Sequence, residues 1–142
     1  SSMKYKLKDY IRIGSPGAIY AAPPFSPQPL ARATSMVVAA KAQKDAINPP
    51  HGFVCSDSRI VETYKYVFPP DLKILAVPDN VSAKNSVQDY ESKYVLEGQT
   101  LTVTRSMKDT SPIPLCASEI NDLYAEIAEA VWKDVKSQIV YK

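Results

Sequence analysis

The chain has 142 residues and a formal net charge of +2, with 17 basic and 15 acidic residues spread along its length. A chain of this size can bury about two thirds of the surface that it exposes when unfolded, so one domain with its own core is expected. The absence of a dense Lys/Arg run argues against a nucleic-acid partner, and the longest apolar stretches, 36–40 and 73–77, are too short for membrane insertion.

The first fifty residues predict strand, loop and an ambiguous segment, in that order. Residues 1–3 are typical of a vector remnant, which would make this a piece of a longer protein. Apolar residues alternate with basic ones over 5–20, which predicts one or two strands interrupted by a turn at 14–17. Four prolines make 21–30 a Pro-rich loop. Segment 31–47 combines strand and helix formers, and we expect a strand that passes into a helical turn.

Two further strands are expected in the middle of the chain. Segment 59–68 is β-branched and aromatic throughout, which predicts a central strand that ends at Pro69-Pro70. Segment 73–77 is a short strand before Pro78. Residues 48–52, which lie between segment 31–47 and the first of these strands, break any regular structure.

The clearest pattern is a hairpin between 90 and 107. Centring a two-residue turn on Gly98-Gln99 gives three apolar pairs: Leu96 with Leu101, Tyr94 with Val103, and Tyr90 with Met107. All three pairs lie on one face, so the register is sharply specified. That face is expected to be buried under a helix or a second sheet.

A C-terminal helix is predicted to cover this face. It begins near Ser118, a plausible N-cap, and carries an apolar stripe at helical spacing. The stripe consists of Ile120, Leu123, Tyr124, Ile127, Ala130 and Val131. Residues 138–141 return to a period of two, which predicts a short final strand. The expected fold is therefore mainly β (α+β): an antiparallel β-sandwich-like sheet packed with one C-terminal amphipathic helix, forming a single domain over 1–142.

The order of these elements resembles a known bacterial module. In the C-terminal part of this chain, the residues that carry the resemblance are Tyr94, 97–105 (EGQTLTVTR), Ile113-Pro114, Tyr124, Asp134 and Gln138-Ile139-Val140. Further upstream they are Glu62, Phe68-Pro69-Pro70 and Val77-Pro78. They are similar to the end of a module of unknown function that occurs beside transglutaminase-like domains in large exported proteins. The resemblance covers roughly 55–142. It implies a mainly β, non-catalytic partner domain in an envelope or secreted protein, and it carries over no catalytic residue.

The two cysteines leave two interpretations open. Cys55 and Cys116 could close a disulfide in an oxidising compartment, or they could be small buried thiols. A cysteine hydrolase also needs a histidine base, and His51 is the only histidine in the chain. It precedes Cys55, whereas the cysteine precedes the histidine in transglutaminase-like enzymes. A cysteine hydrolase is therefore only a distant alternative, and no catalytic residue is assigned.

The tyrosines are the remaining candidates for a site. Tyr64, Tyr66, Tyr90 and Tyr94 could form one aromatic face for a carbohydrate or peptide, although roles in the core and in cross-strand pairs are commoner for such rings. The aspartates have no calcium-loop spacing, so neither a metal nor a cofactor is expected.

The preferred hypothesis is a non-catalytic structural or protein-interaction module of a larger periplasmic or secreted bacterial protein. Its partners would be other domains of the same polypeptide or another protein. A carbohydrate- or peptide-binding β-sandwich module is the alternative.

Overall fold

The computed structural model describes residues 3–22, 30, 53–55, 57–111 and 114–142. The predictions for 31–47, for most of the Pro-rich loop and for His51 lie outside these residues. The strands are β1 (Gly17–Tyr20), β2 (Phe53–Val54), β3 (Ser58–Val67), β4 (Ile74–Ala76), β5 (Val81–Lys84), β6 (Gln88–Glu97), β7 (Thr100–Asp109), β8 (Leu115–Cys116) and β9 (Gln138–Tyr141), and the helix is α2 (Ile120–Val135).

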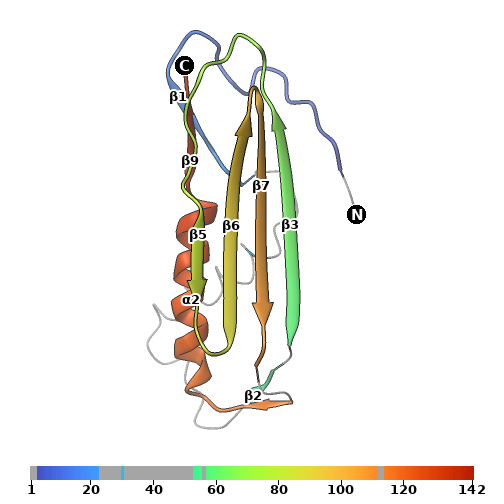
Figure 1. Ribbon diagram of the computed structural model, residues 1–142, viewed down its shortest axis with the longest axis vertical. Coiled ribbons are helices and arrows are strands. Elements are labelled where there is room, and N and C mark those ends of the chain that lie inside the picture. The colour runs from blue at the N-terminus through green and yellow to red at the C-terminus, as the bar shows by residue number, and fades with distance from the viewer. Residues whose placement is uncertain (1–2, 23–29, 31–52, 56, 112–113) are drawn as a thin grey trace.

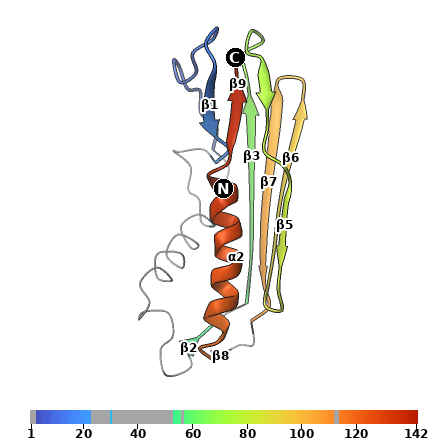
Figure 2. The same ribbon diagram turned by 90° about the vertical axis from the view of Figure 1, so that its left-hand side faces the viewer.

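Two layers make up the molecule. One is a four-stranded antiparallel sheet in the order β3-β7-β6-β5. The other contains α2 and, beyond its C-terminal end, a three-stranded antiparallel sheet in the order β1-β9-β4 (Figures 1 and 2). A two-stranded pair of β2 and β8 closes the opposite end of the molecule. The predicted mainly β fold with one C-terminal helix and a final strand is confirmed.

The hairpin of β6 and β7 has the predicted register. Leu96 lies opposite Leu101, Tyr94 opposite Val103 and Tyr90 opposite Met107. Gly98 supplies the turn with a φ of +58°, a left-handed conformation that is least costly for glycine. The inward residues are buried except Leu96, which lies beside the turn and is 39% exposed.

The core is divided into two apolar clusters along the long axis. The first lies between the hairpin turn and the three-stranded sheet, and includes Leu101, Val103 and Ile139. The second lies under α2, and includes Tyr90, Met107 and Val131. The helix therefore covers one half of the sheet and β9 the other half.

The helix differs in detail from the prediction. It begins at Ile120 with Glu119 as N-cap and no side-chain capping bond, so the predicted Ser118 cap is wrong. The Ser118 hydroxyl instead donates to the Glu119 carboxylate. The buried face of α2 is also rotated from the expected stripe. The buried residues are Ala125, Ile127, Ala128, Val131, Asp134 and Val135.

Two strand predictions need correction. Segment 59–68 does form a strand, β3, that ends before Pro69, but β3 lies at the edge of its sheet and is not central. Its composition is explained by one buried face, since outward-facing Val61 and Val67 are 55% and 74% exposed. In segment 5–20 only β1 is a strand. Asp9 has a φ of +58°, which interrupts the extended conformation that the alternation predicts.

The hairpin facing leads to a stability prediction. We expect Leu101→Asp and Val103→Asp each to lower the free energy of unfolding by about 3 kcal/mol or more, because a charge would enter the core. The matched control Thr102→Asp points away from the core and should cost less than about 1 kcal/mol. Urea unfolding of the three variants tests this, and equal losses at all three positions would contradict the facing.

Candidate functional site

A buried ion pair joins the sheet to the helix. Arg105 of β7 and Asp134 in the last turn of α2 both have side chains that are 0% exposed, and the distance from Arg105 Nε to Asp134 Oδ2 is 2.8 Å. In the part of the chain that the structure describes, the other ion pairs lie on the exposed sheet surface. Among the ion pairs between described residues, this pair is the one whose two charges both lie inside the core.

Two tyrosines complete the arrangement around the Asp134 carboxylate. The Tyr90 hydroxyl donates to Oδ2 at 2.5 Å, and the Tyr94 hydroxyl donates to Oδ1 at 2.7 Å. Arg105 Nη2 donates in turn to the Tyr94 oxygen at 2.7 Å. Each carboxylate oxygen thus accepts at least one hydrogen bond, as a buried charge requires. We call Arg105, Asp134, Tyr90 and Tyr94 the polar core network.

The network follows from the register of the hairpin and the pitch of the helix. Arg105 occupies an inward position of β7, between Val103 and Met107, so its side chain enters the core where the two apolar clusters meet. Asp134 lies three residues after Val131, on the same helix face. Sequence analysis missed this pair. The available signal was a charged residue at an inward position of an otherwise apolar alternating face.

The environment favours the charged guanidinium and the neutral phenols. Burial opposes the charge on Arg105, but the hydrogen bond to Asp134 and the neighbouring Tyr94 outweigh it and hold the pKa of Arg105 above its usual value. Burial, and then the bond to Asp134, raises the pKa of Tyr90. Burial is also the main reason why the pKa of Tyr94 is raised. All three groups therefore keep their protonated forms well into the alkaline range.

Two buried polar atoms in the same region lack a hydrogen-bond partner among the described residues. They are Arg105 Nη1 and the hydroxyl of Ser92, the residue directly opposite Arg105 in the hairpin. The guanidinium carbon also lies 5.7 Å from the centre of the Tyr94 ring and 5.9 Å from that of Tyr64. The faces of these two rings thus supply part of the stabilisation that the Arg105 guanidinium does not receive from a hydrogen bond at Nη1.

The four candidate tyrosines do share one sheet face, and that face is covered. Tyr90 and Tyr94 are 0% and 8% exposed, whereas Tyr64 and Tyr66 of β3 are half-buried. The Tyr66 hydroxyl donates to the Ala21 carbonyl at 3.0 Å, and burial raises the pKa of Tyr66. These rings form cross-layer contacts in the core, so a ligand could reach Tyr90 and Tyr94 only if the layers separated.

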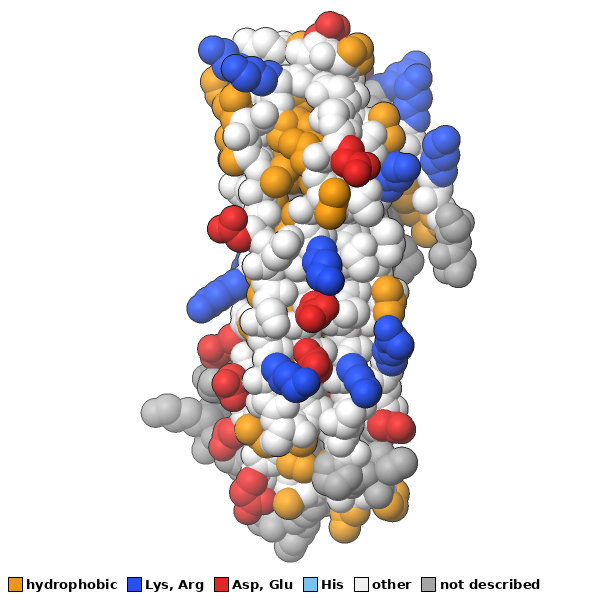
Figure 3. Space-filling view, viewed as in Figure 1, with side chains coloured by type: hydrophobic (Ala, Val, Ile, Leu, Met, Phe, Trp, Pro, Cys, Tyr) orange, Lys and Arg blue, Asp and Glu red, His pale blue; other side chains and the backbone are white. Residues whose placement is uncertain are grey.

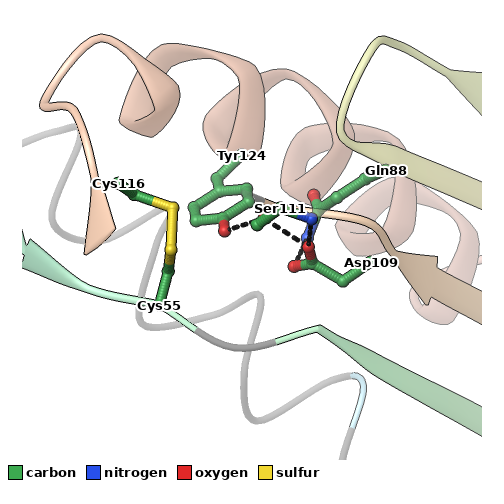
Figure 4. The surroundings of a disulfide bond; sticks show 6 residues. All are labelled: Cys55, Gln88, Asp109, Ser111, Cys116 and Tyr124. Atoms are coloured by element: carbon green, nitrogen blue, oxygen red, sulfur yellow. Dashed lines mark hydrogen bonds between the residues drawn. A yellow bond between two sulfur atoms is a disulfide. The ribbon is translucent and has the colours of Figure 1, made fainter. Parts of the chain in front are cut away.

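A second cluster of polar groups lies at the far end of the sheet, near the disulfide (Figure 4). The Asp109 carboxylate accepts hydrogen bonds from the backbone N–H and the hydroxyl of Ser111, and from the side-chain amide of Gln88. The Ser111 hydroxyl also bonds to the Tyr124 hydroxyl of α2. An open hollow lies outside this cluster, bordered by Arg59 and by Asp109 itself. The cluster ties the end of β7 to the start of the helix.

The two cysteines form a disulfide. Cys55 follows β2 and Cys116 ends β8, and the two residues are 61 positions apart, with their Cα atoms 5.8 Å from each other. Of the two interpretations left open by the sequence, the structure contains the bonded one. A bridge over a loop of this length contributes about 4 kcal/mol in the chain-entropy model. It also removes the thiolate that nucleophilic catalysis by either cysteine would need.

The described residues contain no group of three or more His, Cys, Asp or Glu side chains that could hold a metal ion. Over the same residues, no helix has the length and apolar character to cross a membrane.

No protein-family model matches the chain, and no curated protein matches it. Among solved structures, the chain is similar to a putative protease from Parabacteroides distasonis ATCC 8503, with a TM-score of 0.49 and 12% sequence identity. The alignment covers 64% of this chain but 18% of that one, so the chain spans about a fifth of the length of that protein.

The polar core network predicts a strong asymmetry between single and double variants. Asp134→Ala should lower the free energy of unfolding by about 3–5 kcal/mol, because it leaves the Arg105 charge buried without its counter-ion. Replacing the pair together, with Arg105→Met and Asp134→Leu, should restore most of that loss. Urea unfolding measures both. A double variant that is as unstable as the sum of the two single variants would contradict the prediction.

The raised pKa values of the buried tyrosines predict a loss of stability at high pH. Unfolded tyrosine ionises near pH 10, so stability should be constant below about pH 10 and fall as the pH rises above it. Tyr90→Phe should be less stable at pH 7, having lost its bond to Asp134, but its stability should fall less steeply above pH 10. The control is Tyr20→Phe, whose ring is exposed. Identical alkaline slopes for wild type and Tyr90→Phe would contradict this account.

Proposed function

We propose that this chain is a non-catalytic structural or protein-interaction module of a larger transglutaminase-like bacterial envelope or secreted protein. The observation that carries the proposal is the enclosure of the polar core network. The buried groups with shifted pKa values, which elsewhere mark active sites, here bond to one another and are closed to solvent. Arg105 and Asp134 hold two layers together and present no reactive atom at the surface.

The disulfide supports an exported location. Disulfides persist in the periplasm and outside the cell and are rare in the cytosol. Cys55 and Cys116 join the short β2–β8 pair, which forms only a small part of the structure and gains stability from a covalent link.

The alternative, a carbohydrate- or peptide-binding face of tyrosines, receives less support. Such a face needs ring surfaces that a ligand can reach, and the Tyr90 and Tyr94 rings are enclosed beneath α2 and β9. Tyr64 and Tyr66 are half-buried, and the hydroxyls of both already donate to groups of this chain.

Alkylation of the cysteines tests the non-catalytic assignment. The native chain should not react with iodoacetamide near pH 7, because neither sulfur is a thiolate. After reduction, Cys55 and Cys116 should both react at the slow rate of an ordinary thiol. The control is the same labelling of His51→Ala. Rapid labelling of Cys55 that this substitution abolishes would instead favour a cysteine hydrolase.

The gene context provides a second, independent test. A transglutaminase-like catalytic domain encoded in the same reading frame as this chain, behind an export signal, is the expected result. A reading frame that encodes a cytosolic protein would contradict the proposal.

A further inference from the structure

Among the described residues, no strand pairs with the outer edge of β3, which presents a row of backbone hydrogen-bonding groups. The Phe68 N–H donates to the Gln99 carbonyl at 2.8 Å, which fixes the alternation: even-numbered residues of β3 direct their backbone groups toward β7. The backbone groups of the odd-numbered residues therefore point away from the sheet, and β3 is its last strand. These residues are Arg59, Val61, Thr63, Lys65 and Val67, and their side chains lie on the solvent face.

The two edges of the sheet differ in the length of strand that is available for pairing with another strand. The β5 edge is four residues long and contacts α2, so little of it is available. The β3 edge is ten residues long, contains no proline and pairs with β7 without a register shift. Protection of an edge usually takes the form of a short strand, a bulge, a proline or inward charge. On β3 one charge points inward, that of Glu62, which is 8% exposed and already accepts hydrogen bonds from Leu30 and Tyr64. The other charges, on Arg59 and Lys65, face solvent.

Charge around this edge is mainly basic. Arg59 and Lys65 are exposed on β3 itself. The N-terminal segment of residues 3–13 carries exposed Lys4, Lys6, Lys8 and Arg12 against one acidic residue. Its Ile11 packs against the first core cluster, as Tyr66 of β3 does. Figure 1 shows this segment on the side of β3 that faces away from β7, and Figure 3 shows basic side chains gathered along the same upper margin. Exposed Val61 lies between Arg59 and Lys65, and exposed Val67 follows Lys65, so apolar surface alternates with charge along this edge.

We propose that the open edge of β3 binds an extended acidic segment of a protein partner by strand addition. Backbone bonds to the odd-numbered residues would provide affinity, and acidic side chains opposite Arg59 and Lys65 would provide selectivity. The inference rests on the proposed interaction role and specifies its surface and the chemistry of the partner.

Charge selects this occupant over two others. A second copy of the chain would bring Arg59 and Lys65 of both copies to the same edge, and like charges across a strand pair are destabilising. The chain's own segment 3–13 would add three further lysines, and its left-handed Asp9 prevents a continuous strand. An acidic strand meets neither obstacle.

The test uses the full chain and two synthetic ten-residue peptides, one alternating Glu with Val and the other alternating Lys with Val. Amide exchange and chemical shifts are followed by NMR during each titration. The acidic peptide at about 1 mM should slow exchange of the Thr63 and Lys65 amides, the binding should weaken with added salt, and the basic peptide should have no effect. The amides of β5 act as an internal reference.

Two matched pairs of variants separate backbone pairing from charge. Thr63→Pro removes one outward N–H at an exposed edge position and should weaken binding of the acidic peptide at least about tenfold, whereas Thr63→Ala should not. Lys65→Glu should weaken it similarly, and Lys93→Glu, on the same solvent face but on β6, should have little effect. Because the second pair changes only exposed side chains, it remains informative if Thr63→Pro fails to fold.

Three results would overturn the proposal: no protection of β3 amides by the acidic peptide, equal binding of the basic peptide, or unchanged binding by Thr63→Pro. A wild-type dimer in sedimentation that Thr63→Pro abolishes would also overturn it, in favour of a second copy. None of these results bears on cysteine reactivity or on gene context. Failure here would therefore leave the non-catalytic assignment standing, and rapid labelling of Cys55 would remove that assignment without affecting the β3 edge.

Discussion

The contact on which the rest of this structure depends is the buried ion pair of Arg105 and Asp134. It lies where the covering layer changes from helix to strand, because α2 ends at Val135 and β9 begins at Gln138. An apolar contact at this point would allow the helix to slide or rotate on the sheet, since hydrophobic attraction is non-directional. A charged pair with two tyrosine donors has a defined geometry, and it therefore fixes the position of the helix end relative to β6 and β7.

The same contact explains why the core has two clusters. Tyr94 belongs to the cluster beneath the three-stranded sheet and Tyr90 to the cluster beneath the helix, and both hydroxyls bond to the one carboxylate. The network thus connects two apolar regions that would otherwise be covered independently. Burying charge has a substantial desolvation cost, and the gain in return is a specific alignment of the two layers.

The two sheet edges differ in length and in their surroundings, and the proposed interaction rests on this difference. One edge is short and contacts the helix, and the other is long and carries exposed Arg59 and Lys65. Natural proteins usually protect a long edge because unpaired backbone groups promote aggregation. A long unpaired edge on β3 is consistent with the proposed strand addition by a partner, which would use a surface separate from the polar core network.

Local pattern in the sequence was sufficient for the elements whose facing is set by period and turn chemistry. The hairpin register followed from Gly98 and the alternation on both sides of it, and the helix and final strand followed from the change of period after 118. The open edge position of β3 could not be predicted, because a strand with one buried face has the same composition whether or not it has a second neighbour. Segment 5–13 has the alternating pattern of a strand, but in the described structure it does not form one.

The candidate site depended on tertiary structure to a greater degree. The sequence by itself determined that Tyr90 and Tyr94 share a face and that Arg105 points to the same side, since a period of two fixes the side of every residue in a strand. The packing of α2 decides whether that side is open or covered. It also decides which residue neutralises Arg105, because Asp134 of α2 lies 29 positions further along the chain. Likewise, two cysteines 61 positions apart show no local sign of pairing. Contacts between distant segments depend on how the layers assemble, and only the folded structure specifies that assembly.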